Sequence, residues 1–465
     1  MKIVRLNPFR RIVIILLLIA AAVSGAYFVF SRKGSDIITA LKGSQNQYNV
    51  VLITIDTLRA DRLGCYGYGK NTSPEIDKFA ENAIRFENSI VQSPYTGPSH
   101  SSILTGKYVA GHGVLSNGYK LPLENNTIAE VLKEYGYTTA ASIGAWVLDK
   151  RFNYGQGFDA YMQTNKEQRI AADVNRDLFK WLENNKDKKF FAWAHYYDVH
   201  CPYYAPELFR NKFSNGYKGI LNTDGKCGLT YYNSVKLGPD DIEYVKAMYD
   251  AEIAYTDSNV GELLNNLKKW GVYDNTLIII TSDHGESLYE RGKIGHNLSL
   301  YDCEIKAPLL IRYPGMKSYG TSIKTQVESI SIMPTILDIL GINVPLDING
   351  KSFLNLLEGN REDESPAYVR LGVEKGLDLQ YAIRTAATKL IFHESGTKEL
   401  YDLKADSEEK NNIINDVSRG SMISELSPKL DKFMVLEKKA NTTKGEGQQL
   451  KKESLEKLRA LGYVQ

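Results

Sequence analysis

Short and nearly continuous runs of apolar residues constrain the fold of this chain most strongly. Residues 49–55 (NVVLITI) and 276–280 (TLIII) lack the alternation of polar and apolar residues that is typical of a strand with one wet face. They therefore predict strands that are buried on both faces. Weaker runs predict three more strands, at residues 137–143, 190–194 and 307–312.

Segments with a helical period separate these strands. We expect helices over residues 74–83, 127–135, 168–185, 239–270 and 331–340, the last closed by Gly341. The alternation of strands and helices predicts an α/β fold with a mainly parallel sheet covered by helices on both faces.

The pattern changes after about residue 360. Residues 381–384 and 389–392 predict short antiparallel strands, and polar helical segments follow them to the C-terminus. We therefore expect a large α/β domain over residues 49–360 and a smaller α+β subdomain with a helical tail over residues 361–465.

The N-terminus has the composition of a membrane segment. Residues 12–30 carry no charge and follow four basic residues, and a helix needs about 20 apolar residues to cross a bilayer. The basic flank predicts a single-pass helix with the body of the chain outside the cytoplasm. A cleaved signal peptide is the alternative, because small residues lie near the end of the run. In either case residues 1–33 form the anchor or signal, and residues 34–48 form a polar tether.

Charge and cysteine content exclude some classes of function. The net charge is +2, but residues 1–33 hold six basic and no acidic residues, so the body of the chain is slightly acidic. Such a body is a poor nucleic-acid binder, because it has no positive excess to neutralise phosphates. The four cysteines form no CxxC pair, and both a Cys201–Cys227 disulfide and unpaired thiols fit the sequence.

Reactive side chains follow three of the predicted strands. They are Asp56 after the first strand, His195, Asp198 and His200 after the 190–194 strand, and Asp283 and His284 after the 276–280 strand. The carboxyl ends of parallel strands meet at one edge of a sheet, where ligands bind. Carboxylate oxygens with an imidazole suit a divalent cation. We therefore predict a metal site formed by Asp56, Asp283 and His284.

The segment TGPSHSSILTG, residues 96–106, predicts a short helix. Pro98 suits the first turn of a helix, and Gly106 suits its end. This places the Thr96 hydroxyl and the first backbone amides at a helix N-terminus, which favours anions. Beside a metal ion, the hydroxyl could attack an anionic ester. An ordinary N-cap role for Thr96 is the alternative.

Taken together, these segments resemble the sulfatase family of the alkaline phosphatase superfamily. The resemblance runs from residue 49 to about residue 415, with the family landmarks in their usual order. The segments that carry it are residues 49–61, 96–106, 195–203, 281–286 (TSDHGE), 295–314, 333–338 and 399–403 (ELYDL). The resemblance implies an alkaline-phosphatase-like fold.

Four positions depart from the sulfatase pattern. Thr96 stands where sulfatases carry a formylglycine made from cysteine or serine, and His100 replaces the motif arginine. Asp56-Thr57 replaces an aspartate pair, and Asp283-His284 replaces Asp-Asn. A threonine with an Asp-His metal site resembles the phosphoethanolamine and phosphoglycerol transferase branch, which acts on phosphodiesters of membrane lipids and surface glycans.

The resemblance and the strand-end residues together imply a set of roles. One divalent cation (Ca, Mn, Mg or Zn) is expected, with Thr96 as both ligand and nucleophile. The expected metal ligands are Asp56, Thr96, Asp283 and His284; the catalytic residues are Thr96, His200 and His296; the substrate contacts are His100, His112, Asn117 and His195. His393 is expected to be structural or solvated. The tyrosines at positions 196, 197, 203 and 204 fit either a sugar-binding wall or plain core.

The expected function is that of a membrane-anchored hydrolase of sulfate or phosphate mono- or diesters outside the cytoplasm. Its partners are an anionic ester on a glycan or lipid headgroup and the membrane, with no nucleic acid; the oligomeric state stays open. One alternative is a phosphoethanolamine- or phosphoglycerol-type transferase. Another is a non-catalytic member that binds sulfated or phosphorylated glycans.

Overall fold

The computed structural model describes residues 48–163, 168–214, 216–221, 229–312, 314, 320–357, 364–372 and 379–443. The predicted membrane segment (residues 12–30) and Cys227 lie outside these residues, so neither the anchor nor the Cys201–Cys227 pairing is tested. Within the described ranges, no helix is long and apolar enough to span a bilayer.

Nine strands of the described part form one sheet, in the order β10-β2-β9-β6-β1-β5-β3-β4, with β11 beside β2. The central strand β1 (Asn49–Ile55) lies parallel to both of its neighbours, β5 (Phe190–Tyr196) and β6 (Thr276–Ser282). The other strands are β2 (Ile84–Ile90), β3 (Thr138–Ile143), β4 (Ala160–Met162), β9 (Lys306–Arg312), β10 (Thr321–Ile323) and β11 (Val327–Glu328). Because β9 runs antiparallel to β2 and β6 and the other pairings are parallel, the predicted mainly parallel sheet is confirmed.

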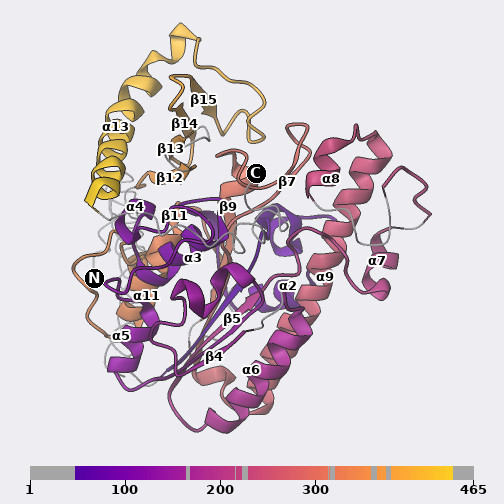
Figure 1. Ribbon diagram of the computed structural model, residues 1–465, viewed down its shortest axis with the longest axis vertical. Helices are drawn as coiled ribbons and strands as arrows, with labels where there is room; N and C mark the ends of the chain where they lie inside the picture. The colour runs from indigo at the N-terminus through magenta and orange to yellow at the C-terminus, as the bar shows by residue number, and fades with distance from the viewer. Residues whose placement is uncertain are drawn as a thin grey trace, which may run out of the picture.

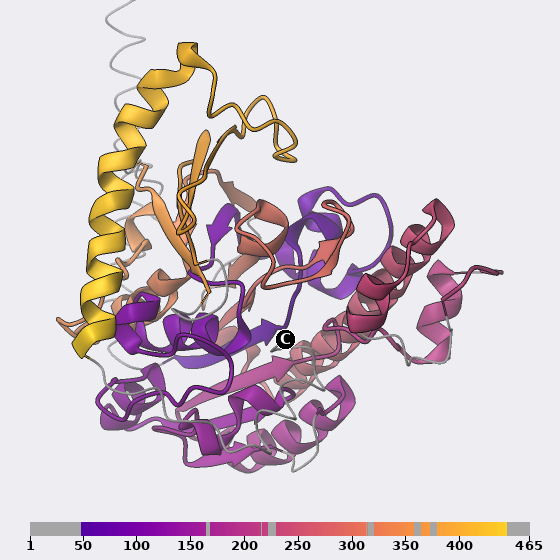
Figure 2. The same ribbon diagram turned by 45° about the horizontal axis from the view of Figure 1, so that its top comes forward.

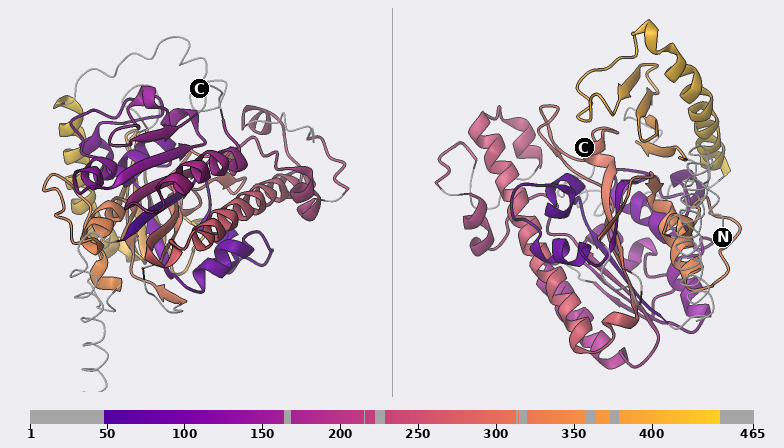
Figure 3. Two further views of the ribbon diagram at one scale, coloured as in Figure 1. Left: turned by 90° about the horizontal axis from the view of Figure 1, so that it is seen from below. Right: turned by 180° about the vertical axis from the view of Figure 1, so that it is seen from behind.

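Helices cover both faces of this sheet. Val50 and Leu52 of β1 belong to a core shared with α3 (Thr96–Thr105), α5 (Ile128–Glu134) and α11 (Ile332–Ile339). Val51 and Ile53 belong to a second core, shared with α2 (Pro74–Ala80), α6 (Ala171–Asn185) and α9 (Pro239–Lys269) (Figure 1). The long α9 extends along one side of the molecule beside α6 (Figure 3). Burial on both faces explains why residues 49–55 show no polar alternation.

The sheet differs from the sequence-based expectation in the number and length of its strands. The short β4, β10 and β11 have no counterpart among the predicted strands. Strand β2 has no counterpart among the predicted strands, because the half-buried Arg85 and Glu87 interrupt its apolar pattern. Strands β5 and β6 each continue two residues further than predicted. His195 therefore lies inside β5, where it pairs with Thr54 of β1 and Ile143 of β3, and not in the loop after the strand.

The C-terminal region forms a separate antiparallel sheet. Its strands are β12 (Ala367–Leu371), β13 (Gln380–Arg384), β14 (Thr388–His393) and β15 (Lys398–Asp402). Helix α13 (Gly420–Thr443) packs Leu426, Leu430 and Phe433 against one face of this sheet (Figure 2). The other face packs against Ile90 and Ile305 of the main body. The two predicted antiparallel strands are confirmed, and each gains an outer neighbour.

Short elements connect these layers. They are α4 (Val109–His112), α7 (Glu207–Phe213), α8 (Leu229–Ser234), α10 (Asp302–Ile305), α12 (Leu354–Leu357), β7 (Ser287–Leu288) and β8 (Ile294–Gly295).

A buried ionic cluster joins the C-terminal sheet to the main body. The Lys389 ammonium, on β14, lies 2.6 Å from Asp302 Oδ1 and 2.7 Å from Glu409 Oε1, and it donates to the Leu300 carbonyl oxygen at 3.0 Å. Arg384 Nη2 lies 2.7 Å from Asp302 Oδ2. Burial by itself would raise the pKa of Asp302, but the two cations outweigh it and hold that pKa below its usual range. The cluster therefore depends on Lys389 to balance two buried carboxylates.

Replacing Lys389 with methionine is expected to lower the free energy of unfolding by about 3–5 kcal/mol, because Asp302 and Glu409 then share one fewer cation in a buried site. Urea unfolding followed by circular dichroism measures the change. The exposed Lys404 offers a matched control: Lys404→Met is expected to change stability by about 0.5 kcal/mol or less. Equal losses in the two variants would contradict a structural role for the cluster.

Candidate metal and nucleophile site

Adjacent parallel strands bring the predicted metal ligands together. Asp56 follows β1, and Asp283 and His284 follow β6, whose last residue, Ser282, pairs with Ile55. One ligand atom from each of Asp56, Asp283 and His284 lies within 4.8 Å of the other two, and all three side chains are fully buried. The register of β1 and β6 therefore places two carboxylates and an imidazole at one point of the sheet edge.

The hydrogen bonds around this group leave several donor atoms facing each other. Asp283 Oδ1 accepts from the backbone amides of Thr57 at 3.1 Å and His284 at 2.9 Å. Within the described part of the chain, Asp283 Oδ2 and both carboxylate oxygens of Asp56 accept no hydrogen bond. His284 Nδ1–H donates to the Gly285 carbonyl oxygen at 2.9 Å, which leaves the Nε2 lone pair for a ligand. Unsatisfied buried oxygens and an imidazole lone pair fit a divalent cation.

The pKa shifts of the two carboxyl groups also favour a bound divalent cation. Burial, together with the adjacent Asp283, raises the pKa of Asp56 well above its usual value. Burial would also raise the pKa of Asp283, but His284, His100 and His195 outweigh it and lower that pKa. Two carboxylates this close repel each other when both are ionised, and a divalent cation would remove that repulsion.

Thr96 begins α3 beside this group. Its Oγ1 lies 3.5 Å from His284 Nε2, and the residue is fully buried. Two of the first amides of the helix, which were expected to face an anion, are already hydrogen-bonded: the Gly97 amide donates to Asn117 Oδ1 at 2.7 Å, and the Ser99 amide donates to the Tyr95 carbonyl oxygen at 2.9 Å. Asn117 Nδ2 is buried without a hydrogen-bond partner among the described residues. Asn117 accepts from the Gly97 amide through Oδ1, so its Nδ2–H groups can serve as donors to a bound anion instead of that amide.

His100 was predicted to contact substrate, but both of its ring nitrogens are hydrogen-bonded within the protein. Its Nδ1–H donates to the Thr96 carbonyl oxygen at 2.8 Å, and its Nε2 accepts from the Thr54 hydroxyl at 3.1 Å. The Thr54 oxygen accepts in turn from the Trp193 indole N–H at 2.9 Å. Burial lowers the pKa of His100 to about 3, so the ring is neutral. This geometry favours a role in fixing the first turn of α3.

His112 is hydrogen-bonded within the protein, whereas the predicted contact of His195 with substrate stays a prediction. His112 Nδ1 accepts from the Val114 amide at 3.1 Å, and Nε2 lies 3.1 Å from the Ser102 hydroxyl, so both nitrogens have structural partners. His195 Nε2 lies 3.5 Å from Asp56 Oδ2. Neither His195 nitrogen is hydrogen-bonded to another described residue, and burial lowers its pKa to about 4. His195 therefore faces the candidate metal group.

His200 and His296 form a second group next to His284. The His296 ring centroid lies 4.6 Å from that of His284 and 4.8 Å from that of His200. Burial lowers the pKa of both His200 and His296 well below the usual value. His296 Nδ1 lies 3.0 Å from Oε1 of Glu286, a residue that sequence reasoning did not single out although it belongs to the TSDHGE segment. Burial raises the pKa of Glu286 to about 8.

The tyrosines near His200 divide between core and site. Tyr196 is core and donates to Asn175 Oδ1 at 2.6 Å. Tyr197 stacks on His200 at a centroid distance of 4.5 Å, and Tyr203 donates to Glu286 Oε2 at 3.0 Å. Tyr204 is half-exposed. A continuous aromatic wall over these four residues is therefore not formed. His393, at a distance from this site on β14, binds Glu399 at 2.7 Å, as expected of a structural histidine.

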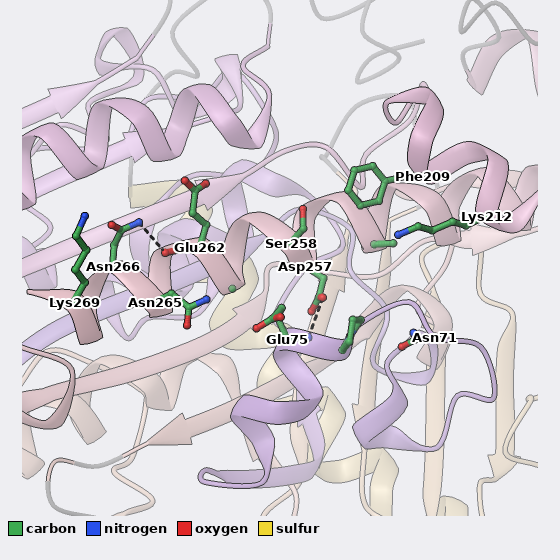
Figure 4. A pocket seen from close by; sticks show the side chains of 13 residues that line it. Asn71, Glu75, Phe209, Lys212, Asp257, Ser258, Glu262, Asn265, Asn266 and Lys269 are labelled. Carbon is green, nitrogen blue, oxygen red and sulfur yellow. Dashed lines mark hydrogen bonds between the residues drawn. The ribbon is translucent and has the colours of Figure 1, made fainter.

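A surface hollow of about 560 Å³ lies elsewhere, between α2, α7 and α9. Figure 4 shows Lys212 and Lys269 at its two ends and Asp257 near its middle. Asp257 accepts from the Glu75 and Ile76 amides at 3.0 and 2.8 Å, so it caps α2. None of the predicted site residues lines this hollow. The candidate site is therefore identified by its possible metal-ligand atoms and not by this surface hollow.

Comparison with known proteins agrees with this architecture. Residues 48–342 match the family model described as Sulfatase, and residues 296–435 match the model described as N-sulphoglucosamine sulphohydrolase, C-terminal. An N-acetylglucosamine-6-O-sulfatase of Bacteroides thetaiotaomicron is 26% identical over 480 aligned residues, 82% of this chain and 85% of the relative. An ulvan-active sulfatase of Formosa agariphila is 28% identical, covering 83% of this chain and 80% of the relative.

Solved structures share the fold. An enzyme in complex with its substrate D-glucosamine-2-N,6-O-disulfate superposes with a TM-score of 0.72 at 23% identity, over 87% of this chain and 100% of that chain. A phosphonate monoester hydrolase from Silicibacter pomeroyi superposes with a TM-score of 0.70 at 22% identity, over 84% of this chain and 96% of that chain. The fold and the matched relatives define an ester hydrolase. The chain belongs to the sulfatase family, whose model covers more than half of its length.

Replacing Asp283 with asparagine is expected to weaken divalent-cation binding by more than the roughly 10- to 100-fold typical of changes outside the ligand shell, because it removes a charged ligand. Titration calorimetry with Mn²⁺ and elemental analysis after dialysis measure this. Asp198→Asn is the matched control. Asp198 likewise follows a strand of the sheet, β5, but it accepts from the Ala171 amide at 3.0 Å and lies outside the metal group. Equal metal content in the two variants would rule out Asp283 as a ligand.

Proposed function

We propose that the chain is a metal-dependent hydrolase that cleaves sulfate or phosphate esters through Thr96 as nucleophile. The observation that carries the proposal is the position of the Thr96 hydroxyl. Its oxygen lies 3.5 Å from His284 Nε2, beside the unsatisfied oxygens of Asp56 and Asp283. A threonine that only capped a helix would need none of these neighbours.

In this mechanism Asp56, Asp283, His284 and the Thr96 hydroxyl would hold one divalent cation. When bound, it supplies positive charge that lowers the hydroxyl pKa and stabilises the transferred anion. Thr96 Oγ1 attacks the sulfur or phosphorus in line with the leaving oxygen and forms a covalent threonine ester. Asn117 Nδ2 donates to a non-bridging oxygen. His200 or His296 takes up the proton that the Thr96 hydroxyl gives up and passes it to the leaving oxygen, whose bond to sulfur or phosphorus breaks. Water then releases the threonine.

The charge of the site favours singly charged esters. Within the described ranges, the ion pairs of Asp56 and Asp283 are with histidines, and no lysine or arginine pairs with them. Arg59 is the nearby arginine: its Nη1 donates to the Glu286 carbonyl oxygen at 2.9 Å. Its guanidinium, however, forms ion pairs with Asp61 and Glu290. A divalent cation is already balanced by two carboxylates. A second negative charge on the substrate would therefore be poorly compensated in this buried site.

The proposed substrate is a sulfated or phosphorylated glycan or lipid headgroup outside the cytoplasm. Two relatives named for N-acetylglucosamine-6-O-sulfate and ulvan support the glycan. The uncharged run at residues 12–30 supports a membrane anchor. Transfer to an acceptor alcohol is the second candidate activity. It is favoured by the combination of Thr96 with Asp283-His284, and it differs from hydrolysis only in the molecule that releases the threonine.

Replacing Thr96 with alanine is expected to lower kcat by about 10³-fold or more, because it removes the nucleophile. Thr96→Ser keeps a hydroxyl and is expected to retain part of the activity. The assay measures release of nitrophenol from bis(p-nitrophenyl) phosphate and p-nitrophenyl sulfate, with Mn²⁺, Ca²⁺ or Zn²⁺. A phosphothreonine or sulfothreonine at position 96, trapped in the wild type and seen by mass spectrometry, supports the covalent step. Full turnover by Thr96→Ala would exclude it.

Singly charged esters are expected to react with kcat/KM at least about tenfold above that of a dianionic phosphate monoester, because the site lacks a compensating cation. The comparison uses p-nitrophenyl sulfate and bis(p-nitrophenyl) phosphate against p-nitrophenyl phosphate at pH 8. Product analysis in the presence of glycerol separates hydrolysis from transfer. A preference for the dianion would contradict the charge argument. Metal binding without turnover of any ester would favour the non-catalytic, glycan-binding alternative.

A further inference from the structure

We propose that Glu286 is a positioning residue that holds the His296 imidazole toward the ester bound at Thr96. The proposal rests on the proposed function, because it assigns His296 a task on that ester. It concerns a bond within the chain, however, and that bond can be measured without any substrate.

The hairpin formed by β7 and β8 places these two residues opposite each other. Ser287 pairs with Gly295 and Leu288 pairs with Ile294 in an antiparallel register. Glu286 precedes β7 and His296 follows β8, so the next step of the same register brings the two side chains together. His296 Nδ1 lies 3.0 Å from Glu286 Oε1, and both side chains are almost fully buried.

Contacts from outside the hairpin fix Glu286 itself. The Tyr203 hydroxyl donates to Glu286 Oε2 at 3.0 Å, and Arg59 Nη1 donates to the Glu286 carbonyl oxygen at 2.9 Å. Across the hairpin, the Asn233 side chain donates to the Ile294 carbonyl oxygen at 2.8 Å and accepts from the Ile294 amide at 3.0 Å. Both carboxyl oxygens and the backbone of Glu286 are thus held, which gives His296 a rigid partner.

The bond determines which ring nitrogen His296 can offer to the site. With Nδ1 bound to Glu286, Nε2 is the nitrogen that can reach a substrate oxygen. The ring lies between His284, which contacts the nucleophile, and His200. An acidic partner that orients a functional histidine in this way lowers the cost of reaching the reactive geometry. Among the described residues, Glu286 forms no hydrogen bond or ion pair with Thr96, Asp56, Asp283 or His284, so its bonded connection to the site is through His296.

A purely structural role for Glu286 in the hairpin makes a different prediction, and a double-mutant cycle separates the two. If Glu286 acts through His296, Glu286→Ala is expected to lower kcat by about 10- to 100-fold with little change in KM. The double variant Glu286→Ala/His296→Ala should then be no slower than His296→Ala alone. Glu286→Gln, whose amide oxygen can still accept from Nδ1–H, should recover most of the activity. Independent losses that multiply in the double variant would overturn the proposal.

Glu290 provides the matched control on the same hairpin. It pairs with Arg59 at 2.5 Å and accepts from the Leu288 amide at 2.6 Å, and it makes no contact with His296 in the described part of the chain. Glu290→Gln is expected to change kcat by about threefold or less. A loss as large as that of Glu286→Ala would indicate that the hairpin as a whole is disturbed, and would overturn the specific role of Glu286.

Nitrogen NMR of the His296 ring tests the proposal separately from catalysis. One tautomer is expected to predominate in the wild type, and a mixture of the two is expected in Glu286→Ala. The same tautomer populations in both proteins would overturn the positioning role, whatever the activity. If the wild type turned over no ester but the tautomer changed as expected, the proposed function would fail while the Glu286–His296 bond would stand.

Discussion

The site is organised by the forced approach of two buried carboxylates, Asp56 and Asp283. Each follows one of two central strands, β1 and β6, and the parallel register of those strands places the two buried side chains next to each other. Asp283 accepts hydrogen bonds from two backbone amides, whereas Asp56 accepts no hydrogen bond from any described residue. Such an arrangement is costly unless a cation completes it.

This repulsion explains why imidazoles surround the group. A histidine can present a lone pair to a metal or a proton to an anion, and it adds no permanent charge to a dry site. His100 and His195 have pKa values lowered by burial to about 3 and about 4, so both are neutral in the folded protein at pH 7. These two neighbours of the carboxylates are therefore polar and uncharged, which leaves the charge of a bound anion to be balanced at the candidate metal group itself.

The sequence was sufficient to predict that Asp56, Asp283 and His284 come together, because their positions depend on strand order and strand ends. Asp56, Asp283 and His284 needed only the apolar runs before them and the rule that parallel strands end at one edge. The roles of His100 and His112 could not be predicted in this way. They depend on hydrogen bonds to partners such as Thr54 and Val114, and therefore on packing and rotamers. Strand β2 was missed for a related reason: its polar residues are tolerated near the edge of the sheet, where periodicity alone is ambiguous.

The departures from the sulfatase pattern are best understood as a pair. Thr57 stands where the pattern has a second aspartate, and its backbone adopts φ 54° while its amide donates to Asp283. His100 stands where the pattern has an arginine. By the sequence resemblance, the two replacements together amount to the loss of one anion and one cation, which would keep the net charge of the site while two fewer charges need to be desolvated. A side chain with a new charge at either position alone would break this balance. Thr57 and His100 are therefore best treated as one coupled change, made around the same two carboxylates.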